Sequence, residues 1–298
     1  MLIVVLILLM LCIYWFIPLD TKEFSLSSNS NSNFSLNLLE NNSLQFYPNM
    51  RFEDTILSYR IVNCPLQRKN DMEWAFDIIA EKTVLSFRPA AYNEDEDITV
   101  TCEEATKTEG NLFIAGEGGP TNITVAGEFN IIEKGKILLM KDSDCSKPNI
   151  AIHELLHVLG FDHSSNPKNI MYEISKCDQD IGDDIIDFIN EIYSIPSKPD
   201  LLFENASAEM HGKYLDAEFS IRNNGLKNAG ESVVRILVDG KEIDDIDIPE
   251  IKIGYGRRIS VTNIWVKQIE IEKIDFVIQD NFEELDKSNN RVSFEIKK

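Results

Sequence analysis

The sequence predicts an α+β domain followed by an all-β sandwich, with an apolar helix in front of both. Residues 1–19 contain no charged side chain. Residues 49–195 mix short strand-like runs with segments of helical periodicity, a pattern typical of an α+β domain. Residues 200–298 read as about seven alternating strands between turn signals, which favours an immunoglobulin-like sandwich. The length of 298 residues accommodates two such domains with flanking segments.

The apolar N-terminal segment predicts a membrane anchor. As a helix, residues 1–19 would span about 28 Å, close to the hydrocarbon thickness of a bilayer. A cleaved signal peptide is the alternative, but no basic residue precedes the run and no alanine or glycine lies near it. The favoured interpretation is a single-pass transmembrane helix that holds the C-terminal body outside, at the cell surface. A cleaved signal would instead give a secreted protein.

The region between the anchor and the first domain, residues 20–48, is rich in serine and asparagine and predicts a flexible stalk. Beyond it, residues 115–120 predict a loop, because three glycines and a proline in six residues suit neither helix nor strand. Period-two and helical patterns predict the remaining elements. The expected strands are 55–61, 83–87, 97–101, 121–128 and 136–140. The expected helices are 69–82, one that begins near residues 146–149 and contains residue 153, and 179–194.

Three histidines carry the chemical signal of the chain. His153 and His157 are four residues apart, so they project from one face of a helix about one turn apart. His163 follows six residues later, and the chain has four histidines in all. Three nitrogen ligands and an open fourth position for water are what a catalytic zinc ion requires. A core helix with incidental histidines is the alternative, and it would leave buried imidazoles in need of polar partners.

Two further residues complete this pattern, H-E-x-x-H-x-x-G-x-x-H. Glu154 sits beside the first predicted ligand, where it could take a proton from a water at the fourth position. Gly160 allows the chain to leave the helix sharply, with a positive φ, so that the third histidine returns to the metal. The sequence therefore predicts one catalytic Zn²⁺ with its own general base.

The same residues resemble a known superfamily. Met171 lies eight residues after His163, and with the histidine pattern it is similar to the metzincins, in which a methionine turn forms the floor under the three ligands. The stretch 163–172 resembles the matrixin branch. This resemblance implies a twisted mixed sheet with three helices and zinc-dependent peptidase activity.

The last predicted helix of this domain resembles the C-terminal helix of matrixins. In that family, paired acidic residues support the methionine turn from behind, and Asp183 and Asp184 match the pair. Two solvated carboxylates are the alternative interpretation.

Four cysteines lie outside the apolar run: Cys64, Cys102, Cys145 and Cys177. An even count in an exported chain suggests two disulfides, and three pairings are possible. A Cys145–Cys177 bond would bracket the predicted zinc helix and the methionine turn, and Cys64–Cys102 would then tie the first helix region to a strand. Free buried thiols are the alternative.

The C-terminal domain carries a second resemblance. Residues 221–225 and 283–290 resemble the CARDB family, found in cell-surface proteins. The resemblance covers this domain alone, and it implies a module that binds a surface protein or glycan.

The net charge disfavours one class of partner, and a local acidic run is a weak indication of a second metal. The net charge of −21 disfavours nucleic acid, because like charges repel. The acidic run at residues 94–97 could hold Ca²⁺, although a solvated loop is the simpler interpretation.

Together these observations predict a membrane-anchored zinc endopeptidase that cleaves extracellular or surface proteins. The alternative is an adhesion or binding protein whose protease domain is secondary or inactive. The intact set of His153, Glu154, His157 and His163 favours the enzyme.

Overall fold

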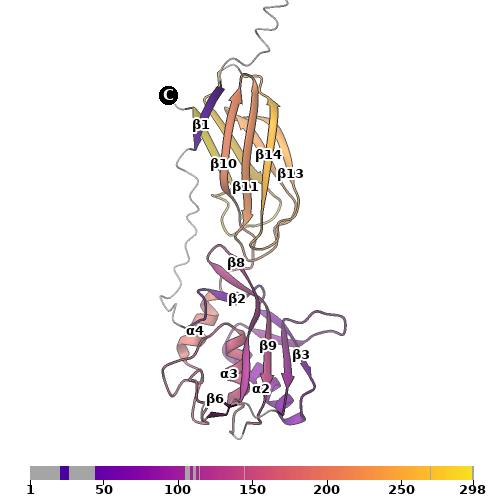
Figure 1. The fold of residues 1–298 in the computed structure, drawn as a ribbon, viewed down its shortest axis with the longest axis vertical. Coiled ribbons are helices and arrows are strands. Elements are labelled where there is room, and N and C mark those ends of the chain that lie inside the picture. The colour runs from indigo at the N-terminus through magenta and orange to yellow at the C-terminus, as the bar shows by residue number, and fades with distance from the viewer. Residues whose placement is uncertain are drawn as a thin grey trace, which may run out of the picture. The chain divides into compact units, whose positions relative to one another are not determined.

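The computed structural model describes residues 21–26, 44–104, 108–109, 112–113, 115–143, 145–268 and 270–296. These residues divide into two compact units. The α+β unit lies within Ser35–Ser197, and the β unit combines Lys198–Lys298 with a strand from the N-terminal region. Each unit has its own apolar core (Figure 1).

A twisted sheet forms the frame of the α+β unit. Five of its strands run parallel in the order β2-β9-β5-β3-β4, and β8 pairs antiparallel with β9. Among the described strands β8 pairs with β9 alone, so it lies at an edge. The strand bounds are β2 (Met50–Phe52), β3 (Ile56–Val62), β4 (Ser86–Pro89), β5 (Ile98–Cys102), β8 (Gly116–Ala126) and β9 (Phe129–Leu139), with a separate short pair β6 (Thr108–Glu109) and β7 (Leu112–Phe113).

Three helices complete this unit: α2 (Leu66–Lys82), α3 (Asn149–Val158) and α4 (Asp183–Ile192). Figure 1 shows α2 and α3 packed with the sheet. In α4 the buried residues recur at i, i+3, i+4 and i+7, which places one apolar stripe on the core. The prediction of a mixed sheet with three helices is confirmed.

The predicted loop at residues 115–120 is wrong, because residues 116–120 are the first half of β8. Gly116 pairs with Leu139 and Gly118 with Ile137 in a regular antiparallel register. Local composition favoured a loop, since glycine has little strand propensity of its own. The ladder with β9 and the close approach of α3 override that preference.

A buried arginine ties the first strand of the sheet to the end of α4. Arg51 is 1% exposed, and its guanidinium donates hydrogen bonds to the carbonyls of Ile192 and Ile195, both at 2.8 Å. It also lies 4.5 Å from the ring centroid of Tyr193. Its remaining bonds go to the carbonyls of Phe52 and Glu53 and to the Ser197 hydroxyl. Burial lowers the pKa of Arg51 from its ordinary value.

Replacement of Arg51 by alanine should therefore lower the free energy of unfolding of the α+β unit by about 3 kcal/mol, because buried carbonyls would lose their donors. Chemical denaturation of the whole chain measures this loss. Lys69→Ala is the matched control, since Lys69 forms only an exposed i,i+4 pair with Glu73 and its removal should change stability by less than about 0.5 kcal/mol. Equal denaturation midpoints for the Arg51 and Lys69 variants would contradict a stabilising role of Arg51.

The β unit is a sandwich, as predicted. One sheet contains β10 (Leu201–His211), β11 (Tyr214–Asn223) and β14 (Gly256–Trp265), and the other contains β12 (Ser232–Val238), β13 (Lys241–Ile248), β15 (Lys273–Gln279) and β16 (Arg291–Ile296). Burial alternates strictly along β11 and β12, so every second side chain enters the core.

The predicted stalk at 20–48 requires a correction. Its first part forms β1 (Thr21–Leu26), which pairs with β10 through Thr21–Glu23 and with β16 through Phe24–Leu26 and so links the two sheets of the sandwich. Its last part, from Leu44, belongs to the α+β unit. Both segments satisfy backbone groups of distant strands or loops, which local composition does not reveal.

The predicted transmembrane helix at residues 1–19 lies outside the described residues. Within the residues that the structure describes, no helix is both long enough and apolar enough to span a bilayer.

Candidate metal centre and active site

The helix α3 and the turn after it bring the three predicted ligands together. His153 and His157 project from consecutive turns of α3 and are buried, whereas His163 is exposed. Gly160 has a φ of +95°, and this left-handed turn ends the helical path and directs the chain back toward the histidines. The Nε2 atom of His157 lies 3.0 Å from that of His153 and 3.2 Å from that of His163.

The hydrogen bonds of the Nδ1 atoms indicate which tautomer His153 and His157 adopt. Nδ1 of His153 donates to the carbonyl of Ile170, and Nδ1 of His157 donates to the carbonyl of Phe161, each at 2.7 Å. Because a carbonyl only accepts, the Nδ1 atoms carry the protons and the Nε2 atoms of both rings carry lone pairs. Two lone pairs cannot bond to each other, so this arrangement suits a cation bound between the rings.

The donor set fits zinc. Tetrahedral zinc with Zn–N bonds of 2.0–2.1 Å holds its ligand nitrogens roughly 3.3 Å apart, close to the separations found here. Burial, and then the neighbouring His153, lower the pKa of His157 to about 4, and burial lowers the pKa of His153. Both rings are therefore neutral near pH 7, the form that binds a metal. Within the described chain, these three histidines are the group able to hold an ion.

Glu154 points its carboxyl group toward the edge strand β8. It is 6% exposed, and burial, followed by the charge of Glu117, raises its pKa to about 8. A divalent ion on the adjacent histidines would favour the carboxylate and lower this pKa. A carboxyl group that titrates near neutrality beside a metal is suited to accept a proton from water and release it again.

Two glycines of β8 make room for Glu154, and sequence reasoning missed them as site residues. A Cβ on Gly116 would lie 2.7 Å from the Cγ and Oε1 atoms of Glu154, and a Cβ on Gly118 would lie 2.3 Å from the Glu154 carbonyl oxygen. Gly119, in contrast, has no atom within 4 Å of the corresponding position. The alternation of Gly116 and Gly118 on one strand face was the available signal, since glycine in a strand often marks close backbone approach.

Met171 lies in a tight turn, one residue after the carbonyl that binds His153. It is fully buried, its amide donates to Asn169 Oδ1 at 2.9 Å, and its carbonyl accepts from the Ser164 amide at 2.8 Å. The preceding carbonyl, of Ile170, is the one that orients His153. The turn that contains Met171 therefore also orients the His153 ring, through the Ile170 carbonyl.

Asp183 and Asp184 lie in the first turn of α4, and both are exposed. Asp184 Oδ1 accepts a hydrogen bond from the Ile185 amide at 3.0 Å. Two carboxylates at a helix N-terminus also interact favourably with the helix dipole. Their support of the methionine turn stays a prediction.

The structure contains the two disulfides Cys64–Cys102 and Cys145–Cys177. The first joins the segment before α2 to the end of β5. The second closes a loop that includes α3, the turn at Gly160 and Met171, so it restrains the whole candidate site.

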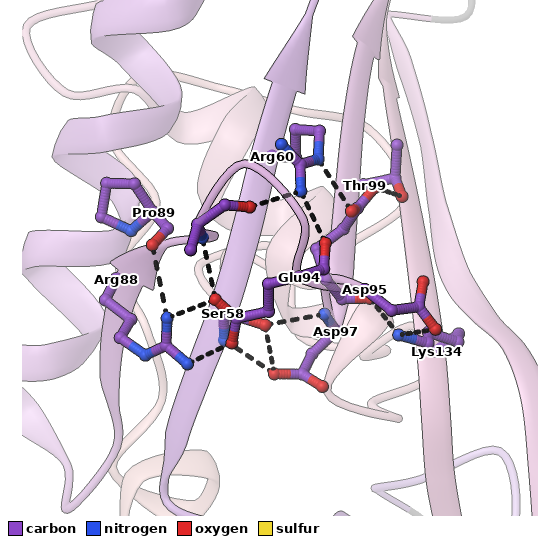
Figure 2. Close-up of polar contacts among 11 residues, drawn as sticks. Ser58, Arg60, Arg88, Pro89, Glu94, Asp95, Asp97, Thr99 and Lys134 are labelled. Carbon is purple, nitrogen blue, oxygen red and sulfur yellow. Dashed lines mark hydrogen bonds and ion pairs between the residues drawn. The ribbon is translucent and has the colours of Figure 1, made fainter.

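The acidic run at 94–97 does not support the predicted calcium site. Figure 2 shows its carboxylates bound by side chains of the same unit. Glu94 binds Arg88, Glu96 binds Arg60 at 2.8 Å, Asp95 lies 3.1 Å from the Lys134 ammonium, and Asp97 accepts from Ser58 at 2.7 Å. Arg88 lowers the pKa of Glu94 to about 2. Arg60 of β3, Arg88 of β4 and Lys134 of β9 thus form ion pairs with three of these four carboxylates, and Ser58 binds the fourth.

A histidine triad on a helix and its following turn, with a methionine turn bonded to one of the histidines, is characteristic of the metzincin class of metal site. Comparison with family models gives the more specific assignment. Residues 51–194 match the model for matrixins, and residues 198–294 match the model for CARDB. The chain thus combines a region similar to matrixins with a region similar to CARDB domains. The matrixin match suggests metallopeptidase activity and implies zinc and a peptide substrate.

Other comparisons give little beyond these families. No curated protein matches the chain. A solved structure with partial similarity is the CARDB domain of a Pyrococcus furiosus protein, determined in complex with di-metal ions. It is 15% identical, covers 33% of this chain and 87% of that chain, and superposes with a TM-score of 0.28.

The asparagine that marks the CARDB resemblance has an internal structural role. Asn223 is fully buried, and its Oδ1 accepts from the amides of Asp200 and Gly225 at 3.1 and 3.0 Å. Its Nδ2 donates to the carbonyls of Lys227 and Ile251 at 2.7 and 3.1 Å. It therefore holds together the turns at one end of the sandwich. Its four hydrogen bonds are all internal, so they give no indication of what the domain binds.

Proposed function

We propose that this protein is a zinc-dependent endopeptidase. The observation that carries the proposal is the convergence of three imidazole Nε2 atoms, two of which carry lone pairs. The buried Glu154 follows His153 on the same helix. Zinc held by His153, His157 and His163 would supply an acidified water and a Lewis acid for the scissile carbonyl.

The chain's own residues would perform the proton transfers. Glu154 accepts a proton from the attacking water and passes it to the leaving amine. The carbonyls of Ile170 and Phe161 hold two ligand rings in the required tautomer through both steps. Gly116 and Gly118 keep β8 close to Glu154, which fixes the carboxyl group relative to the histidines.

The edge strand β8 is the proposed site of substrate binding. Residues Gly116–Ala126 pair with β9 on one side, and the same strand lies against α3 at Glu154. An extended peptide can add to such an edge through its backbone, which gives affinity without strict sequence requirements. This arrangement suits an unfolded or extended protein segment as substrate.

We further propose that the enzyme acts at the cell surface, on extracellular or surface proteins, and that the apolar segment at residues 1–19 anchors it there. Two disulfides favour an oxidising compartment. The CARDB domain would bind a surface protein or glycan. An open groove of about 600 Å³ beside β12 and β13, lined in part by Asp245, Asp247 and Asp280, offers one contact surface.

The test is to measure zinc and hydrolysis on the same preparation. The expected result is one zinc per chain by elemental analysis and cleavage of an unfolded protein or quenched peptide library, both lost after chelation and both restored by zinc. Zinc without any cleavage across the library would favour the adhesion alternative. A chain that takes up no zinc would overturn the proposal.

A further inference from the structure

The segment that leads into β2 packs on the turn that precedes the third histidine. We call residues 44–50 the strap. The Phe46 amide donates to the carbonyl of Gly160 at 3.0 Å, and the Asp162 amide donates to the carbonyl of Leu44 at 2.9 Å. Gln45 and Phe161 form the antiparallel bridge between these two bonds. The strap is thus hydrogen-bonded to the residues immediately before His163.

The strap is held in shape by its own buried side chain. Gln45 is 7% exposed, its Nε2 donates to the Met50 carbonyl, and its Oε1 accepts from the Met50 amide, both at 2.8 Å. A Cβ on Gly160 would lie 2.7 Å from the Cβ of Met50. The left-handed turn at Gly160 and the strap therefore fit together without room for a side chain between them.

An aromatic ring of the strap contacts the second histidine directly. The Phe46 ring is stacked on the His157 imidazole, with the ring centroids 5.6 Å apart and the planes inclined by 24°. Phe46 is 40% exposed, so this contact lies at the surface of the site. The neighbouring Tyr47 is 55% exposed. A flat ring on an imidazole limits its rotation and shields one of its faces from water.

We infer that the strap is a positioning element of the metal centre. It holds the Gly160–Asp162 turn, and hence His163, through backbone bonds, while Phe46 orients His157. The contacts that support this role join the strap to residues 160–162 and to His157, so its effect passes through the predicted ligands. This inference rests on the proposed zinc function and extends it to residues outside the histidine motif.

The experiment compares the zinc affinity of the full chain with that of Phe46 variants, by competition with a chromogenic chelator. Phe46→Ala should weaken zinc binding by about 10-fold or more, the range found when groups that orient ligands are removed. Phe46→Tyr should retain the wild-type affinity, because the ring is kept. Tyr92→Ala is the matched control, because Tyr92 is 95% exposed and lies outside the strap, and it should also retain the wild-type affinity. Phe46→Leu keeps apolar bulk without the ring, and it should also bind zinc more weakly than the wild type. It therefore tests the ring separately from any folding defect of the alanine variant.

Steady-state kinetics separate positioning from substrate contact. At saturating zinc, a positioning role predicts a lower kcat with KM largely unchanged for Phe46→Leu. A raised KM with wild-type zinc affinity would make Phe46 a substrate contact and would overturn the inference. Wild-type zinc affinity in Phe46→Ala and Phe46→Leu would overturn it as well. If the wild-type chain itself binds no zinc, the failure lies with the proposed function.

Discussion

Replacement of Glu154 by glutamine should abolish peptide hydrolysis while zinc remains bound. The amide has nearly the shape of the carboxyl group but cannot accept a proton from water. General base catalysis contributes about 10²–10⁴-fold, so kcat should fall by about a thousandfold. Because the side chain is 6% exposed in a fitted space beside Gly116, an isosteric change should leave the fold intact.

The measurement pairs a quenched-peptide assay with zinc analysis of each preparation. Glu81→Gln provides the control, since Glu81 is an exposed residue of α2 and its change should alter neither quantity. Wild-type turnover by the Glu154 variant would remove this residue from the mechanism. Loss of zinc together with activity would instead mean that Glu154 is needed to maintain the metal site.

Replacement of Gly118 by alanine should inactivate the enzyme without any change to a reacting group. The new Cβ would lie 2.3 Å from the Glu154 carbonyl oxygen, which is a backbone atom and cannot move aside alone. Either β8 or α3 must shift. Overpacking of this kind costs about 1–3 kcal/mol of stability, and a displacement of about 1 Å in a catalytic group can lower the rate by about 10²-fold.

Gly119→Ala is a closely matched control, because the same substitution one residue later meets no atom within 4 Å. It should keep wild-type activity and stay within about 0.5 kcal/mol of wild-type stability. Thermal unfolding and kcat, measured on both variants, provide the comparison. Similar behaviour of Gly118→Ala and Gly119→Ala would show that the approach of β8 to α3 is not required.

The chemistry of the site was accessible from sequence because it is encoded locally. His153, Glu154 and His157 lie within one and a half turns of one helix, so the helical repeat alone determines which side chains face together. Gly160 and His163 follow within six residues. The three helices and the sandwich were predictable for the same reason, since an apolar stripe or an alternating strand is visible in a short window.

The elements that were misread are those whose partners are distant in sequence. The composition of residues 116–120 is typical of a loop, but these residues pair with β9. Gly116 and Gly118 are suited to this strand because α3 approaches it too closely for a larger side chain. The strand β1 was taken for part of a stalk, although its pairing partners lie in β10 and β16, near the other end of the chain. Secondary-structure propensity is a property of a single segment, whereas strand pairing depends on two segments. Propensity alone therefore does not predict which strands pair.

The sequence by itself predicted the histidine set, the role of Glu154 and the fold class of each domain. These predictions follow from spacings of one to ten residues and from the period of apolar side chains. The structure confirms the fold classes and brings the three histidines together. Only the tertiary structure decided which edge strand lies on Glu154, which cysteines pair among three possibilities, and that Phe46 stacks on His157. Contacts of this second kind join residues far apart along the chain, and their free energy depends on the packing of the whole unit.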